Sequence, residues 1–137
     1  MSDVSASLHA EVVRRADNRC EYCGLSQVGQ EAAFHLDHVL PRTAGGPTTA
    51  DNLALACVSC SLRKWARRTA ADPESGRDVP LFNPRTQAWQ DHFCWDGVEI
   101  VPLSPTGRAT VAALAMNRPL IVAIRREEMD RGRHPPE

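Results

Sequence analysis

The sequence predicts a small α+β fold in which two cysteine pairs close a ββα core, with a helix before it and a β-hairpin and helices after it. Three observations predict this fold: two matched CxxC pairs, an alternating segment followed by a short apolar one, and a segment free of Gly and Pro after the second pair. The chain has 137 residues, enough for one domain with its own core. Only 5% of them are aromatic, so a further source of stability would help that core.

The core elements follow from local patterns. Residues 7–17 predict a helix, because their apolar side chains recur at helical spacing. Residues 33–40 alternate as a strand does, and a loop dense in turn-forming residues joins them to an apolar second strand over residues 53–56. Residues 58–70 can continue as one helix until a turn-rich stretch ends it. The ββα core therefore covers about residues 18–70.

The second half of the chain predicts an extension over about residues 78–131. An Asp-Gly pair at residues 96–97 is the favoured two-residue turn of a β-hairpin. Ser104 followed by Pro starts one helix, and Pro119 starts another. The tail over residues 131–137 is expected to be loose.

The bulk composition excludes several classes of protein. The formal net charge of −1 at pH 7, taken alone, argues against a nucleic-acid partner. No apolar run reaches the length of about 18 residues that a membrane span needs. The N-terminus has no basic start followed by an apolar block, so we expect no signal peptide and a cytoplasmic protein with reduced thiols. Residues 1–137 are interpreted as a single domain.

The cysteines carry the strongest signal. Two CxxC turns can bring four thiolates to one ion, and the four predicted ligands are Cys20, Cys23, Cys57 and Cys60. Four sulfur ligands suit a tetrahedral Zn²⁺ with no open position, which makes the zinc structural. A redox CxxC and two disulfides are the alternatives. Cys94 is left over, and we expect it to be buried beside Trp95.

A second motif lies between the cysteine pairs. The chain reads LDHVLPRTAGG over residues 36–46, then DNLALACVSCS over residues 51–61, then Lys64. This resembles the HNH endonucleases, whose ββα-metal motif has Asp-His, Pro, Gly-Gly, Asn-Leu, CxxC followed by Asn or His, and a downstream Lys. VPLFNPR, WQDHFCWDG, TGRATV and NRP are similar to the remainder of a bacterial HNH subfamily. The resemblance implies a treble-clef-like HNH nuclease domain over the whole chain.

The chemistry of these residues suits phosphodiester hydrolysis. A neutral imidazole, with a pKa near about 6.5, can accept a proton from water, so His38 is the candidate general base. Asp37 is an adjacent hard oxygen donor for a cation. The resemblance implies that Asp37 binds a catalytic Mg²⁺ or Mn²⁺, that His38 activates water, and that Asn52 braces the loop that carries the histidine.

The chain departs from the family pattern at three positions. Ser61 stands where relatives place Asn or His as the second ligand of the catalytic metal, and a hydroxyl is a weaker ligand than either. Trp65 replaces a Gly after the Lys, and Asn83 replaces a His before Pro. His35 lies two residues before Asp37 on the same strand, so it could substitute as a ligand, or it could be a half-buried structural histidine.

Charge is unevenly distributed along the chain. Residues 42–68 hold five bases and one acid, a net charge of +4, whereas residues 69–99 have a net charge of −4. On one helix, Arg63 and Arg67 would stand i, i+4, as would Lys64 and Arg68. The candidate phosphate contacts are Arg42, Arg63, Lys64, Arg67 and Arg68. They would bind double-stranded DNA with weak sequence preference, and a solvated helix surface is the alternative.

The sequence thus predicts a metal-dependent HNH endonuclease that cuts DNA and leaves, by family resemblance, a 5′-phosphate. A catalytically weakened HNH fold that only binds nucleic acid is the first alternative, and a zinc-stabilised protein-interaction domain is the second. Three histidines are given no catalytic role. His92 is expected to pack in the hairpin, and His9 and His134 are expected to be solvated.

Overall fold

The computed structural model describes residues 4–137, so the first three residues of the predicted domain lie outside the described residues. The chain begins with α1 (Ala6–Arg15), whose first turn is capped by Ser5 Oγ accepting from the backbone N–H of Leu8 at 3.1 Å. The helix ends two residues earlier than predicted, because Asp17 and Asn18 adopt positive φ angles of 54° and 55°. On its predicted apolar face Val12 is buried, and Leu8 and Val13 are partly buried.

The predicted ββα core is confirmed. Strands β1 (His35–His38) and β2 (Leu53–Ala56) pair antiparallel, with Asp37 opposite Ala54 and His38 opposite Leu53. The first strand is shorter than predicted, whereas β2 has the predicted bounds and is buried throughout. Helix α2 (Val58–Lys64) follows and packs against both strands. Three 3-10 turns lie in the loops: η1 (Gln27–Gly29), η2 (Arg42–Ala44) and η3 (Ala50–Asn52).

The predicted helix over residues 58–70 is wrong in its second half. Helix α2 ends at Lys64, where Trp65 turns the chain with φ 50° and ψ −127°. A hairpin of β3 (Thr69–Ala71) and β4 (Asp78–Pro80) takes the place of the missing turns. Its connection is fixed by the buried Asp72, which pairs with Arg108 at 2.9 Å. The expected i, i+4 pairs between Arg63 and Arg67 and between Lys64 and Arg68 therefore do not form on one helix.

The C-terminal half has the predicted hairpin and helices. The short α3 (Trp89–His92) leads into β5 (Phe93–Asp96) and β6 (Glu99–Pro102), which pair antiparallel around the predicted Asp-Gly turn. Helix α4 (Pro105–Ala113) is capped by Ser104, and α5 (Pro119–Asp130) begins at its Pro. His92 packs beside Phe82 with ring centroids 5.8 Å apart, so its predicted packing role is confirmed.

Three expectations for this half are wrong. The tail is not loose, because His134 is only 8% exposed, packs edge-on against Trp95 at 4.6 Å and bonds through Nε2 to the carbonyl of Gly97 at 2.9 Å. His134 is therefore not solvated, whereas His9 is exposed as expected. Cys94 is exposed instead of buried, since β5 alternates and turns the residues on either side of it inward.

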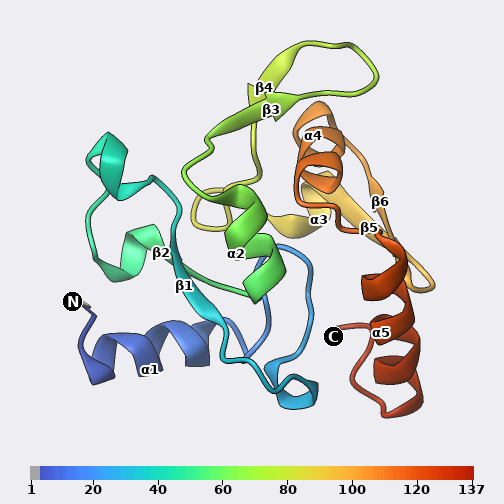
Figure 1. The fold of residues 1–137 in the computed structure, drawn as a ribbon, viewed down its shortest axis with the longest axis horizontal. Helices are drawn as coiled ribbons and strands as arrows, with labels where there is room; N and C mark the ends of the chain where they lie inside the picture. Colours follow the sequence, from blue (N-terminus) through green and yellow to red (C-terminus); the bar gives the residue numbers. More distant parts are fainter. Residues whose placement is uncertain (1–3) are drawn as a thin grey trace.

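Figure 1 shows α2 in the middle of the molecule, with α1 below it, α5 at the right and the β3–β4 hairpin projecting at the top. One buried cluster joins α1, the ββα core, the β5–β6 hairpin and the C-terminal helices. Its largest members include Tyr22, Phe82, Phe93, Leu55 and Ile121. Within residues 4–137, no helix combines the length and the apolar character that crossing a bilayer requires.

Candidate functional site

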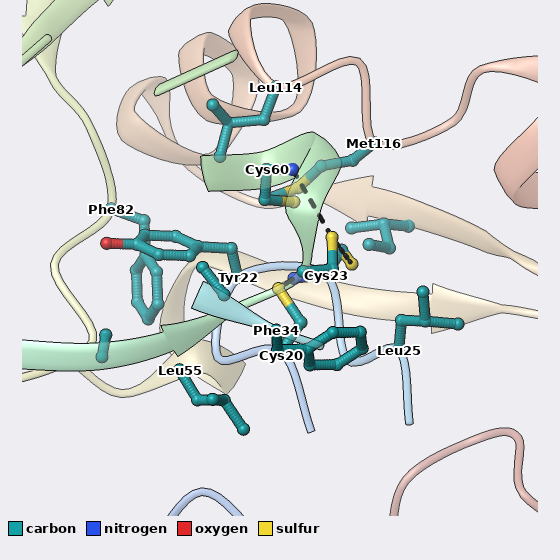
Figure 2. Packing of buried hydrophobic residues seen from close by; sticks show 14 of the residues in the cluster. Cys20, Tyr22, Cys23, Leu25, Phe34, Leu55, Cys60, Phe82, Leu114 and Met116 are labelled. Carbon is teal, nitrogen blue, oxygen red and sulfur yellow. Dashed lines mark hydrogen bonds between the residues drawn. The ribbon is translucent and has the colours of Figure 1, made fainter. Parts of the chain in front are cut away.

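The four cysteines form a buried cluster. Their sulfur atoms all lie within 4.8 Å of one another, and Cys23 Sγ is 3.7 Å from Cys57 Sγ. The first pair occupies the turn after α1, and the second starts α2, where Cys57 is the N-cap and accepts from the N–H of Cys60. Figure 2 shows Cys20, Cys23 and Cys60 among apolar neighbours such as Phe34 and Met116. Such a closed set of sulfur ligands could hold a structural zinc ion.

The electrostatics of the cluster fit a cation. Burial raises the pKa of Cys20, and the neighbouring thiols together with burial raise the pKa of Cys60. Hydrogen bonds from the other thiols hold the pKa of Cys57 far below its usual range. Because zinc binds cysteine as the thiolate, zinc binding would have to displace protons from thiols such as Cys20 and Cys60, whose pKa is raised.

Arg125 on α5 gives the cluster a positive neighbour. The side chain is 1% exposed, and its Nε and Nη2 have no hydrogen-bond partner within the described part of the chain. Burial lowers its pKa, and the nearby Cys23 and Cys60 oppose that shift. A zinc ion with four thiolates carries a net charge of −2. A buried guanidinium whose Nε and Nη2 donors are unpaired within the described residues would therefore be better compensated by the zinc-bound cluster than by the metal-free one.

The second site is a cleft between β1 and α2. Its volume is about 420 Å³, and it is lined by His35, Asp37, His38, Ser61 and Arg42, among others. Because side chains alternate along a strand, His35 and Asp37 both face α2, where Ser61 and Lys64 are their partners. His38 points to the opposite side of the strand and bonds to Thr48 in the loop before η3. The predicted general base and all three candidate ligands of the catalytic metal thus line one cleft, with His38 on the opposite side of the strand from His35 and Asp37.

Asp37 is held firmly within this cleft. The side chain is 7% exposed, its Oδ2 accepts from Tyr22 Oη at 2.6 Å, and Lys64 Nζ lies 3.1 Å from the same oxygen. Burial raises the pKa of Asp37, against the opposing effects of Lys64 and Tyr22. The lysine also lies 3.3 Å from the backbone carbonyls of His38 and Val39, so it fixes the end of the strand as well as the carboxylate.

The loop after β1 is braced from within. Asn52 accepts from the N–H of Leu40 at 2.9 Å and donates to the carbonyls of Leu40 and Pro47 at 3.1 and 2.9 Å. A Cβ on Gly46 would lie 1.7 Å from the carbonyl oxygen of Leu40, so only Gly fits there. The same loop supplies Thr48, whose hydroxyl bonds to Nε2 of His38 at 2.9 Å and orients the ring.

The remaining candidate ligands contact each other. His35 Nδ1 and Ser61 Oγ are 2.9 Å apart, and both are partly exposed. In residues 4–137, the cysteines form the only group of three or more His, Cys, Asp and Glu side chains close enough to share an ion. The cleft is therefore not a preformed metal site. Its donor set fits Mg²⁺, which is commonly held by one or two carboxylates together with waters and substrate phosphates.

The five predicted phosphate contacts do not behave alike. Arg42, Arg63, Arg67 and Arg68 are exposed around the cleft and at the end of α2. Lys64 is 2% exposed and is committed to Asp37, so its position corrects the expectation that it lies on an exposed helix face.

Sequence reasoning missed three supporting residues: Tyr22, Thr48 and Arg125. Tyr22 lies inside the first CxxC turn, where a buried aromatic could have been expected, but its bond to Asp37 depends on tertiary structure. Thr48 and Arg125 carried no local signal.

The fold and these two sites define a ββα core with a four-cysteine cluster and a polar cleft on β1. The model of the HNH endonuclease family matches residues 20–67, from the first cysteine of the cluster to just past α2. The resemblance is thus confirmed for this segment, and the match supports a nuclease-type function and a nucleic-acid substrate in general. No curated protein and no solved structure matches the chain.

Proposed function

We propose that the protein is a metal-dependent endonuclease that hydrolyses phosphodiester bonds of DNA. The observation that carries the proposal is the cleft between β1 and α2, which brings Asp37, His38 and Ser61 together inside the segment that matches the family. Arg42 in this cleft and the exposed arginines on and just after α2 would bind the phosphates of double-stranded DNA without reading its sequence. We propose a cytoplasmic location, where cysteines that form no disulfide, such as those of the cluster, stay reduced.

His38 is proposed to take the proton from the attacking water. Its ring is half-buried on the strand edge, and the bond to Thr48 holds it in one orientation. A general base needs a fixed position next to the proton that it accepts, and the loop braced by Asn52 provides one. The proposed catalytic residues are thus His38, Asp37 and Asn52, of which Asn52 positions the loop after β1.

Asp37 is proposed to hold a Mg²⁺ or Mn²⁺ ion, with Ser61 and His35 as the other candidate ligands. Such an ion would neutralise the charge that develops on the phosphate and on the leaving oxygen. Tyr22 and Lys64 fix the carboxylate before any ion binds, so little reorganisation is needed. The four cysteines are proposed to hold structural zinc, which ties the turn over residues 20–23 to the start of α2.

The experiment measures nicking of supercoiled plasmid by the purified full chain, loaded with zinc, with and without added Mg²⁺ or Mn²⁺. Omitting the ion is preferable to adding a chelator, which would also remove zinc. We expect nicking to need the added ion and to fall by at least about 100-fold in His38→Ala. His9→Ala, an exposed histidine on α1, serves as the matched control and should nick normally. Equal nicking by His38→Ala and the wild type would refute the role of His38.

The same assay separates the alternatives. A chain that shifts DNA in a salt-dependent way but does not cut it would be a nucleic-acid-binding module. A chain with no affinity for DNA at low salt would fit a zinc-stabilised protein-interaction domain.

Ser61 can be tested directly. Ser61→Asn adds a stronger ligand and should lower the Mg²⁺ concentration for half-maximal nicking by about tenfold. No change in that concentration would show that Ser61 does not limit ion binding.

A further inference from the structure

An exposed apolar pair lies at the rim of the cleft. Leu62 and Trp65 are 60% and 75% exposed, and both line the same cleft as Asp37 and His38. Tryptophan is on average one of the most deeply buried residue types, so an indole this exposed leaves much apolar surface in water. That surface lies beside the groups proposed to do chemistry.

The backbone at Trp65 is also unusual. Its φ of 50° with a ψ of −127° is a conformation that glycine adopts readily and that a bulky residue adopts only with strain. The N–H of Trp65 bonds to the carbonyl of Ser61 at 2.9 Å, which keeps the residue at the end of α2. Since the indole projects into solvent, packing within the chain does little to offset this strain. Strain of this kind points to a role in binding.

The charge around the pair identifies the kind of ligand. Arg63, Arg67 and Arg68 are exposed on and just beyond α2, and the exposed Arg42 lines the same cleft as the pair. Arg67 and Arg68 form no ion pair with the described residues. Cations around an exposed aromatic ring favour a polyanion that also carries flat apolar groups. A nucleic-acid strand has both features, whereas an apolar protein surface would leave the guanidinium groups without anions.

We propose that Trp65, with Leu62 beside it, stacks on an unpaired nucleobase next to the phosphate in the cleft. The inference rests on the proposed nuclease function and adds a substrate class to it: single-stranded DNA, or a duplex that contains an unpaired base. In a fully paired duplex both faces of each base are already stacked, so an indole can reach a base face only where pairing is lost. The arginines then hold the flanking phosphates.

The experiment measures binding instead of cleavage. Zinc-loaded full chain carrying His38→Ala, without other divalent ions, is titrated by fluorescence anisotropy at fixed salt against labelled DNA of about 20 nucleotides. The probes are a single strand, a paired duplex, and the same duplex with one unpaired base. Trp65→Phe, Trp65→Leu and Trp65→Ala are compared in this background, and Leu120→Ala, which removes an apolar side chain 65% exposed on α5, is the matched control.

We expect Trp65→Ala to weaken binding of the two probes with unpaired bases by about 5- to 150-fold, with a much smaller effect on the paired duplex. Trp65→Phe should retain more of the affinity than Trp65→Leu, since stacking needs an aromatic ring, and Leu120→Ala should bind normally. Equal losses for all three probes, or no loss, would overturn the proposal. So would a lack of DNA binding, or a dimer of the chain that Trp65→Ala dissociates. In the separate plasmid assay, where His38 is intact, nicking that does not depend on Trp65 would overturn this proposal and leave the nuclease function standing. Binding that depends on Trp65, together with no nicking in that assay, would refute only the nuclease function.

Discussion

The buried pair of Asp37 and Lys64 offers the sharpest test of how the cleft is built. The two side chains are 7% and 3% exposed, and the shortest distance between their charged atoms is 3.1 Å. Replacing the lysine by Met keeps its apolar stem but leaves a carboxylate buried beside Tyr22 alone. Breaking a buried pair in this way destabilises a protein by about 3–5 kcal/mol. At a typical urea dependence of about 2 kcal/mol per molar, Lys64→Met should lower the unfolding midpoint by about 2 M.

A double-mutant cycle isolates the interaction from the loss of each side chain. Lys64→Met, Asp37→Asn and the double variant are unfolded in urea at pH 7, with zinc bound and no other divalent ion. The double variant should be more stable than the sum of the single effects predicts, by about 1–3 kcal/mol. Arg63→Met, an exposed neighbour on the same helix, is the control and should change stability by no more than about 0.5 kcal/mol. Additive effects, or a loss below about 1 kcal/mol in Lys64→Met, would refute the pairing.

The pH dependence of the same variant has a defined sign. Burial raises the pKa of Asp37 in the folded state, and Lys64 is the largest influence that lowers it. Without the lysine the folded pKa rises further, so the folded state holds the proton more tightly than the unfolded state does. Stability is then retained at low pH and lost as the pH rises through the folded pKa. The penalty of Lys64→Met should therefore be larger at about pH 8 than at about pH 5.

Three further predictions test other parts of the fold. Cys57→Ser should bind less than one equivalent of zinc and lose cooperative thermal unfolding. The reason is that the binding free energy of a structural zinc, about 10–16 kcal/mol, exceeds the net stability of a typical domain. An unchanged melting temperature would contradict this prediction. Gly46→Ala should destabilise by at least about 2 kcal/mol in urea, because its Cβ would collide with the carbonyl of Leu40, and wild-type stability would show that the loop can move aside. Arg108 holds the pKa of Asp72 well below its usual range, so this stabilisation is present above the unfolded pKa of about 3.9 and is lost as the pH falls. The stability difference between the wild type and Asp72→Asn should accordingly shrink from about pH 5 to pH 3, and a constant difference would exclude the ion pair as its source.

The core elements and the cysteine ligands could be predicted from sequence because their signals are local. The CxxC pairs and the strand alternation each lie within a few residues, and the structure has them where the patterns place them. The end of α2 could not be predicted in this way. Residues 58–70 contain no Gly or Pro, and the helix stops because Trp65 takes a positive φ and Asp72 is drawn to Arg108 on α4. That partner lies far along the chain, so no local pattern reveals the β3–β4 hairpin.

In the candidate site, too, the residues with a local signal could be predicted and those held by long-range contacts could not. Asp37, His38 and Asn52 could be found from a motif, whereas the partners that fix them could not. The exposure of Lys64 was predicted incorrectly because helical spacing gives the face of a residue, while burial depends on what packs against that face. Here the strand carrying Asp37 packs there, and the buried carboxylate attracts the ammonium group.

The C-terminal extension contributes to the cysteine cluster as well as to the core. Arg125 donates from Nη1 to the carbonyl of Val98 at 3.0 Å and to Asn117 Oδ1 at 3.2 Å, and its guanidinium carbon lies 5.2 Å from the ring centre of Trp95. The same guanidinium faces Cys23, so α5 and the β5–β6 hairpin close over one side of the cluster. Residues 20–67 alone would leave that side to solvent and would lose the buried positive charge. We therefore expect zinc binding to stabilise the extension together with the ββα core, so that the two halves of the chain unfold together.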